Sequence, residues 1–231
     1  MPPRANQANH GAKRAPITRD RVLHEALCLA DVGGAEALTI RAVAEHLAVT
    51  PMALYHHVRN KEDIVNGMLD LVMGEIELPV FGAHWQSEMA RRATSARRVL
   101  NAHPWAIHLL QAGSAPGPAT LRHHNAVLGV LREAGFTITE TAHAFALLDS
   151  YIYGFALSET TLPIRGPQSV PEVAQAMMGR SSDLGHPLAG YPYLVEFSTE
   201  HILQPCYDFG AEFGFGLDLI LAGLQRTLGS R

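Results

Sequence analysis

Residues 38–69 read LTIRAVAEHLAVTPMALYHHVRNKEDIVNGML, and this stretch decides the fold. It holds two short helical segments joined by a brief turn at Ala48-Val49, which is the pattern of a helix-turn-helix. Thr39 and Thr50 each stand at the start of a segment, where a hydroxyl oxygen can cap free backbone N–H groups. Pro51 then occupies the first helical position, where its missing N–H costs nothing. The expected helices cover 39–47 and 50–57.

The second of these helices presents side chains that suit a DNA groove. Leu54 and Val58 must face inward, which leaves the remaining positions for the groove and its rim. The helix starts suit phosphate oxygens, Arg41 can reach a phosphate or a guanine edge, and Tyr55 and Lys61 suit the backbone. The predicted DNA-binding residues are Thr39, Arg41, Thr50, Pro51, Met52, Ala53, Tyr55, His56 and Lys61. A three-helix packing unit without DNA is the alternative, and His57 fits either DNA or a packing role.

The chain before this stretch is expected to complete a DNA-binding domain over 17–63. Thr18 can cap a helix that runs to about Asp31, after which Gly33-Gly34 stops it. Residues 1–16 are rich in Pro, Asn, Ala and Gly, so we interpret them as a flexible arm. The arm either touches DNA phosphates or is a disordered terminus.

Residues 64–231 are expected to form a larger helical domain. Asn60 caps a helix over 61–77, and a period near 3.6 in the apolar residues continues beyond it. The further expected helices span 85–102, 104–111, 118–134, 138–160, 191–204 and 207–228. Eight Pro and Gly residues fall within 161–190, which predicts a mobile loop with a helical turn at 172–178. Since no strand-like alternation appears, the predicted fold class is all-α: a three-helix DNA-binding head on a helical body.

Composition and charge narrow the class of protein. The 231 residues are 47% hydrophobic and 17% charged with a net charge of −4, which excludes a disordered chain and a general nucleic-acid coat. Residues 1–61 carry a charge of +3 and the remainder −7, so positive charge gathers at the DNA-binding end. No apolar run approaches the ~20 residues of a membrane span, and the first residues lack a signal-peptide core. These features predict a cytoplasmic protein without a membrane partner.

The stretch 38–69 closely resembles the DNA-binding segment of the tetracycline-repressor (TetR) family. The residues that carry this are the xRxVAExLxVTxxALYxHV core and the NKEDI helix start. The remainder resembles that family's regulatory domain more loosely, through Trp85, Gly113 with Pro116, Ala134-Gly135-Phe136 and FGFGLDLILAGL at 213–224. The resemblance implies a ligand-responsive repressor that binds a palindromic DNA operator and is released by a small molecule. An activator or a non-responsive DNA-binding protein is the alternative.

The resemblance also implies a homodimer. The helices at 138–160 and 207–228 would form a four-helix bundle with their copies in the partner. Both are apolar on more than one face, which is more than one subunit can bury. A monomer core is the alternative.

The effector is expected to bind between the fifth and eighth helices. The predicted ligand-binding residues are Arg92, Trp105, His108, His124, Leu128, Phe145, Asp149 and Ile152. Asp149 lies within an apolar helix and needs a partner when buried. Three partners remain open for Asp149: a cationic or hydroxylated ligand, a tyrosine of the partner subunit, or Arg92. Trp105 and Phe145 fit either the core or ligand stacking.

No metal, cofactor or catalytic residue is predicted. The founding repressor of the family holds a magnesium-bound drug through a His and a partner Glu, but Gln111 and Ser158 stand at the matching positions here. His108 and Glu159 lie nearby but out of phase. Adjacent histidines on a helix point ~100° apart and cannot easily share a metal, and no HExxH motif occurs. We therefore expect a regulator and not an enzyme, with a helical metal-dependent enzyme as the remaining alternative.

The two cysteines raise one further alternative. Cys28 and Cys206 lie far apart and form no CxxC motif, which suits a reducing compartment. A thiol sensor could replace the effector site. Cys28 is expected to be buried and inert, and Cys206, after Pro205, to be accessible.

Overall fold

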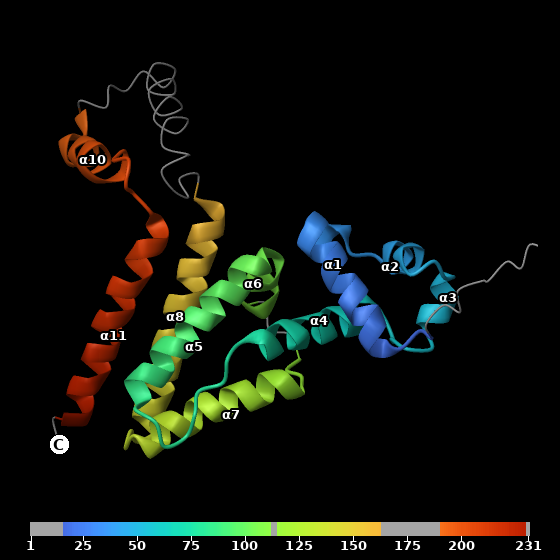
Figure 1. Cartoon of the computed structure of the whole chain (residues 1–231), viewed down its shortest axis with the longest axis horizontal. Coiled ribbons are helices and arrows are strands. Elements are labelled where there is room, and N and C mark those ends of the chain that lie inside the picture. The colour runs from blue at the N-terminus through green and yellow to red at the C-terminus, as the bar shows by residue number, and fades with distance from the viewer. Residues whose placement is uncertain (1–15, 112–114, 163–189, 230–231) are drawn as a thin grey trace, which may run out of the picture.

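The computed structural model describes residues 16–111, 115–162 and 190–229 (Figure 1). Every extended regular element in these ranges is a helix, so the prediction of an all-α fold is confirmed. The predicted arm at 1–16 and loop at 161–190 fall almost entirely outside the described residues.

The head consists of α1 (Arg19–Ala37), α2 (Ile40–His46) and α3 (Pro51–Leu54), and α4 (Lys61–Glu75) leads from it into the body (Figure 1). The inward faces of these four helices form one apolar core. Its most deeply buried side chains include Val22, Val43, Leu54, Ile64 and Met68. Since α4 contributes to this core and also packs on the body, a tilt of α4 moves the head.

Two boundaries in the head differ from the prediction. The Gly33-Gly34 pair interrupts α1 as predicted, because Gly34 has a φ of +73° and is not helical, but the first run passes Asp31 and a short second run continues to Ala37. Glycine adopts this conformation without strain, so the chain kinks there and then resumes its helical path. Helix α3 ends at Leu54 and not near His57, because the chain turns through the following residues before Asn60 caps α4.

The body holds α5, α6, α7, α8, α10 and α11. Their bounds are Trp85–Ala102, Pro104–Gln111, Pro118–Glu133, Ile138–Thr161, Pro192–Phe197 and Glu212–Gly229. The first four match the predicted helices to within one residue. The predicted helix 191–204 is instead divided into α10 and a π-helical turn (Ser198–Ile202), and α11 starts at Glu212 after a 3-10 turn. Helix α5 packs on α8, and α11 runs beside α8 at the edge of the body (Figure 1).

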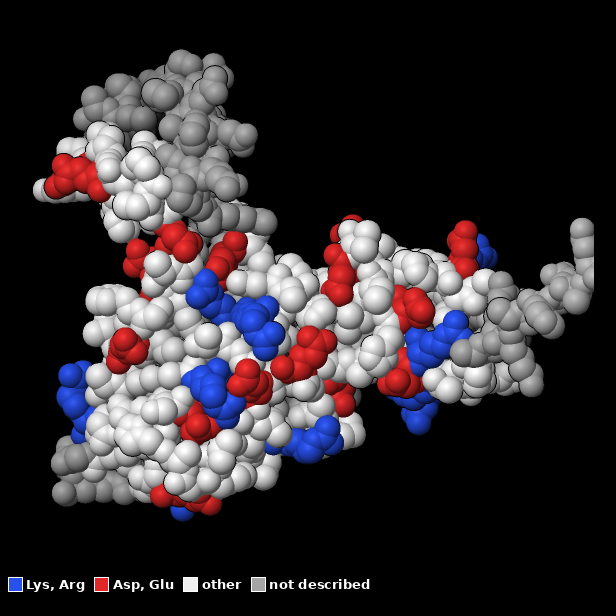
Figure 2. All heavy atoms as spheres, viewed as in Figure 1, with Lys and Arg blue, Asp and Glu red and all other residues white. Residues whose placement is uncertain are grey.

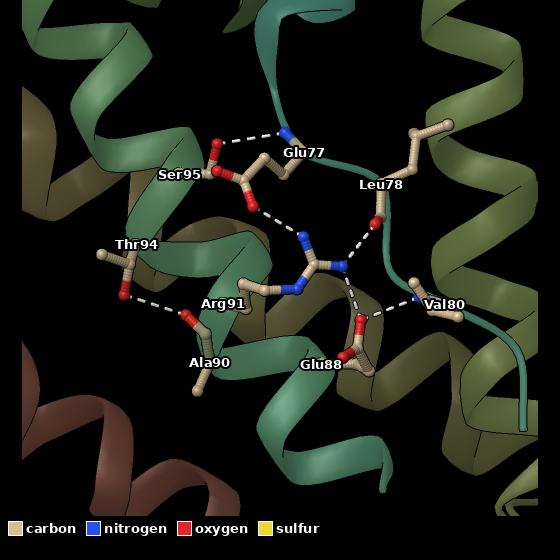
Figure 3. Close-up of polar contacts among 8 residues, drawn as sticks. All are labelled: Glu77, Leu78, Val80, Glu88, Ala90, Arg91, Thr94 and Ser95. Carbon is tan, nitrogen blue, oxygen red and sulfur yellow. Dashed lines mark hydrogen bonds and ion pairs between the residues drawn. The ribbon is translucent and has the colours of Figure 1, made fainter. Parts of the chain in front are cut away.

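The connection from α4 to α5 is held by one arginine, as Figure 3 shows. The Arg91 guanidinium donates to Glu77 Oε2, to the carbonyl oxygen of Leu78 and to Glu88 Oε2, each at 2.6 Å. The backbone N–H of Val80 donates to the same Glu88 oxygen at 2.8 Å. These contacts bind the segment after α4 to the first turns of α5, so the helix that carries the head is anchored to the body.

The turn between α2 and α3 contains a residue in the left-handed region. Ala48 has a φ of +54°, which an L side chain adopts only with strain. We expect Ala48→Gly to leave the free energy of unfolding within about 0.5 kcal/mol, because relief of strain offsets the greater freedom of glycine in the unfolded chain. Ala42→Gly, in regular α2, is the control and should cost about 1 kcal/mol. Equal losses in chemical denaturation would contradict this account of the turn.

Candidate DNA-binding and effector sites

Four capped helix starts set the geometry of the head, and the first is that of α1, where Thr18 Oγ1 accepts from the N–H of Arg21 at 3.2 Å. Thr39 Oγ1 accepts from the N–H of Ala42 at 3.0 Å, and Thr50 Oγ1 accepts from the N–H of Ala53 at 3.4 Å. Asn60 Oδ1 caps α4 in the same way. The caps are those expected from the sequence, since capping depends on residues within one turn.

The predicted DNA-binding side chains lie on the outer surface of the head. Leu54 and Val58 are fully buried beneath them, as predicted. Met52 is 71% exposed and Tyr55 is 51% exposed, so both side chains are available for contact. The other exposed members of the set are Thr39, Arg41, Thr50, Pro51, His56 and Lys61, whereas Ala53 is half-buried. The head therefore exposes small, apolar and cationic groups at the predicted DNA-binding positions.

An ion pair joins the two ends of the head. Arg19 donates to both oxygens of Asp63, at 2.9 and 2.8 Å, and the N–H of Arg59 donates to the same carboxylate at 2.9 Å. The hydrogen bond from Arg19 is the main reason that the pKa of Asp63 lies below its ordinary value. On the face drawn in Figure 2, Lys and Arg alternate with Asp and Glu over the head. Arg19 is thus engaged in holding α1 against α4.

The body contains a buried polar cluster formed by α5, α7 and α8. Arg92 is 1% exposed, and its Nη2 donates to Asp149 Oδ1 at 2.6 Å. Its Nε donates to Nε2 of His123, which is fully buried, at 3.0 Å. Of the three partners that the sequence left open for Asp149, the structure thus provides Arg92. His123 was not among the predicted residues, although its place on the inward face with Val127 and Val130 could have indicated it.

The buried imidazole of His123 should make stability depend on pH. Burial, and then the charge of Arg92, lower the pKa of His123 from 6.5 to about 3. As the pH falls below 6.5, His123 becomes protonated in the unfolded chain. In the folded protein it stays neutral until about pH 3. The free energy of unfolding then decreases by up to about 1.4 kcal/mol per pH unit. Chemical denaturation at about pH 7.5 and about pH 5 should show this decrease in the free energy of unfolding for the original protein. The decrease should be smaller in His123→Asn. An equal decrease in both proteins would contradict this account.

The other predicted effector residues divide into two groups. The His124 ring meets the Phe145 ring edge-on at 5.3 Å, on the side of the cluster where Leu128 is exposed, and Ile152 is buried further along α8. These residues share the α7–α8 side of the body with Asp149. Trp105 and His108 do not join them, because α6 turns Trp105 toward the head and leaves His108 exposed.

Trp105 belongs to a polar joint between head and body. Its Nε1 donates to Asp31 Oδ1 of α1 at 2.7 Å. Nδ1 of the buried His103 lies 2.7 Å from the same oxygen, and its Nε2 lies 3.3 Å from Glu75 Oε2 at the end of α4. One imidazole thus bridges carboxylates from the head and from the connecting helix. The sequence analysis did not foresee this joint, because its members lie 28 to 74 residues apart.

A second contact joins α4 to α7. Asp70 Oδ2 accepts from the N–H of Ala119 at 3.1 Å, and Oδ1 accepts from the N–H and hydroxyl of Thr120 at 2.8 and 2.9 Å. A carboxylate at a helix N-terminus also meets the positive end of the helix dipole. The N-terminus of α7 is therefore bound to α4 through one carboxylate.

Glu159 of α8, which the sequence analysis placed out of phase with a metal-drug site, is engaged within the chain. Arg97 donates to both of its oxygens at 2.8 and 2.5 Å, and Asn101 donates to one at 2.7 Å. The hydrogen bond from Arg97 is the main cause of the lowered pKa of Glu159. Within the described ranges, no three His, Cys, Asp or Glu side chains converge on a point where a metal ion could bind.

Two further observations concern the cysteines and the membrane. Cys28 is exposed, so the prediction that it is buried is wrong. Leu23, Ala26, Leu27 and Ala30 occupy the inward face of α1, and position 28 falls outside that face. Cys206 is exposed, as expected.

In the parts of the chain that the structure describes, no helix is long and apolar enough to span a membrane.

Comparison with known proteins decides the family. The model of the tetracyclin repressor-like C-terminal domain matches residues 78–228, and that of the bacterial regulatory proteins of the tetR family matches residues 22–68. The chain belongs to the TetR family. It is 30% identical to an HTH-type transcriptional regulator of Saccharopolyspora erythraea, over 92% of this chain and 86% of that protein. It is also 30% identical to the HTH-type transcriptional repressor DrrR1 of Streptomyces coeruleorubidus, over 93% and 80% of the two chains.

A solved structure agrees with this assignment. The TetR-family protein ActR of Streptomyces coelicolor, in complex with actinorhodin, aligns with a TM-score of 0.74 at 26% identity, over 94% of this chain and 100% of that one. As a TetR-family member, the present chain is a ligand-responsive transcriptional repressor and not an enzyme. The family assignment confirms the prediction made from residues 38–69.

Proposed function

We propose that this TetR-family repressor binds a two-fold symmetric DNA operator in the cytoplasm as a homodimer, and that a small molecule bound among α5, α7 and α8 releases it. The observation that carries the proposal is the exposed outer surface of α2 and α3 above a fully buried core. Two such heads related by a two-fold axis read half-sites about 34–36 Å apart, or somewhat more. The bacterial chromosome, and therefore the operator, lies in the cytoplasm.

The outer faces of α8 and α11 support the homodimer. Phe215 is 69% exposed and Leu219 is 58% exposed on one stripe of α11, and Leu147 is exposed on α8. A methyl group added at Gly154 or Gly214 would meet nothing within 4 Å, so the backbone on this side is open to close approach. Most of the surface over α11 in Figure 2 is also uncharged. An apolar face of this kind is suited to a second copy of the same helices.

The contacts of α4 support release by an effector. A ligand beside His124 and Asp149 would displace α7 or α8, and α7 is bound to α4 through Asp70. The joint of Asp31 with His103 then links α4 and α5 to the head. A hundredfold loss of DNA affinity needs a coupling free energy of about 2.7 kcal/mol, which one such shift can supply.

Selection of DNA from random sequence, followed by a screen for releasing compounds, tests the proposal. The full-length protein should enrich a palindromic duplex, and compounds that raise its melting temperature should also lower its affinity for that duplex. A protein without preference for any duplex at moderate salt would contradict the proposal. Stabilising compounds that leave DNA affinity unchanged would contradict the release mechanism.

Tyr55 and Lys61 are expected to contact DNA phosphates. We expect Tyr55→Ala and Lys61→Ala to weaken binding to all duplexes, and Lys61→Ala to reduce the slope of log K against log salt by about one. Fluorescence anisotropy at several salt concentrations measures both effects. Arg98→Ala, which removes an exposed cation from α5, is the control. A change in base preference at unaltered salt slope would show that these residues read bases instead.

A thiol-responsive repressor is the second candidate, favoured by the exposure of both cysteines. Replacement of Cys28 and Cys206 by alanine separates the two mechanisms. On our proposal, release by small molecules survives the double replacement. Loss of the response would favour the thiol sensor.

A further inference from the structure

The cluster of Arg92, His123 and Asp149 holds more hydrogen-bond donors than acceptors. Arg92 Nε donates to His123 Nε2 at 3.0 Å, so that ring nitrogen carries no proton. The neutral imidazole must then carry its proton on Nδ1. Among the residues that the structure describes, neither His123 Nδ1 nor Arg92 Nη1 has a hydrogen-bond partner, and both atoms are buried. Two N–H groups are therefore left unpaired in the interior of the body.

Unpaired buried donors are costly and rare in folded proteins. An acceptor that enters the cluster would satisfy them, and neither atom can serve as an acceptor for a ligand in this protonation state. The pKa of about 3 for His123 agrees with a neutral ring. The chemistry of the free groups thus selects an oxygen acceptor, and the planar guanidinium is matched to an oxyanion such as a carboxylate.

The route into the cluster indicates the rest of the ligand. Arg92 and His123 are fully buried, but the Asp149 side chain remains 13% exposed on α8, one helical turn from Phe145. There His124 and Phe145 meet edge-to-face, with both rings half-buried. Aromatic side chains beside a polar cluster suit a flat aromatic body with one polar end.

We propose that the effector is an aromatic acid, whose carboxylate or phenolate oxygen binds Arg92 Nη1 and His123 Nδ1 and competes with Asp149 for the guanidinium. This proposal rests on the proposed function and adds to it the chemical class of the effector. It also assigns Asp149 a role: its carboxylate pairs with Nη2 of the arginine, and its negative charge opposes the approach of a second anion to Nη1. The competing hypothesis is a cationic effector that binds the carboxylate of Asp149.

Removal of the negative charge at position 149 tests the proposal, because it should strengthen the binding of an acid and weaken the binding of a cation. The probes are 2-naphthoate and anthraquinone-2-carboxylate, each with the matched aminomethyl compound, and the readouts are melting temperature and calorimetric Kd of the full-length protein. We expect the acids to bind and the amines not to bind. Asp149→Asn keeps an oxygen acceptor for Arg92 but removes the competing charge, so acid affinity should rise about tenfold. Arg92→Lys, which keeps the charge but loses the planar donors, should lower it.

Three outcomes would overturn the proposal: no acid binds, the amines bind instead, or Asp149→Asn weakens acid binding. The matched control is Glu133→Gln, which removes an exposed carboxylate at the end of α7 and should leave the Kd unchanged. Binding to the selected operator is measured on the same proteins. Absence of operator preference contradicts the proposed function, whereas release of the operator by amines contradicts this inference alone.

Discussion

Leu219→Arg is expected to convert the protein to a monomer and to weaken binding to a two-half-site operator at least about 100-fold. Leu219 and Phe215 form the exposed apolar stripe of α11, and a buried arginine there would meet its own copy across a two-fold axis. With the dimer lost, the second head no longer binds intramolecularly, and the gain from two linked contacts disappears. Light scattering after size exclusion measures the mass, and anisotropy measures the affinity.

Leu121→Arg is the matched control for this experiment. Leu121 is 55% exposed on α7, near the N-terminus of that helix and away from α11 (Figure 1). The same substitution there should leave both the mass and the affinity unchanged. A dimeric Leu219→Arg protein with normal DNA binding would show that the subunits associate through another surface.

The second large effect is expected at the buried pair of Arg92 and Asp149. Asp149→Leu leaves the guanidinium without its counter-charge in a nearly solvent-free site, and Arg92→Met does the same to the carboxylate. Each single substitution should lower the free energy of unfolding by about 3–5 kcal/mol. The double variant should lose less than either one, because no unpaired charge remains.

Denaturant unfolding of the four proteins gives the coupling energy between the two residues. A matched exposed pair, Arg91 with Glu77, should show a coupling of at most about 1 kcal/mol by the same cycle. Additive losses at Arg92 and Asp149 would mean that the two groups do not stabilise one another. The pair would then be a poor basis for an internal competitor of an effector.

The parts of the structure that depend on neighbouring residues were predictable. The caps at Thr39, Thr50 and Asn60 and the burial of Leu54 and Val58 follow from chemistry within one or two helical turns. The bounds of α5 to α8 were predicted for the same reason. The kink at Gly34 was less predictable, because glycine can end a helix or bend it, and tertiary packing decides which.

The effector site was only partly predictable, since its contacts join distant parts of the chain. Asp149 stood out as an acid within an apolar helix, and it pairs with Arg92, which lies 57 residues away in the sequence. His123 was not predicted, although of the two adjacent histidines it is the one that lies on the buried face of α7. Trp105 was assigned to the effector site, yet its indole N–H needs an acceptor, and Asp31 supplies it from the head.

The joint at His103 bears on the construction of chimeric regulators. Its acceptors come from α1 and from the end of α4, so the border between the recognition and sensing halves crosses two segments of sequence. A foreign head grafted at the α4–α5 connection would bring its own residues at positions 31 and 75. Without carboxylates there, the N–H groups of His103 and Trp105 in the recipient would be buried without a hydrogen-bond acceptor. A functional hybrid sensor would therefore need both acids transplanted together with the head.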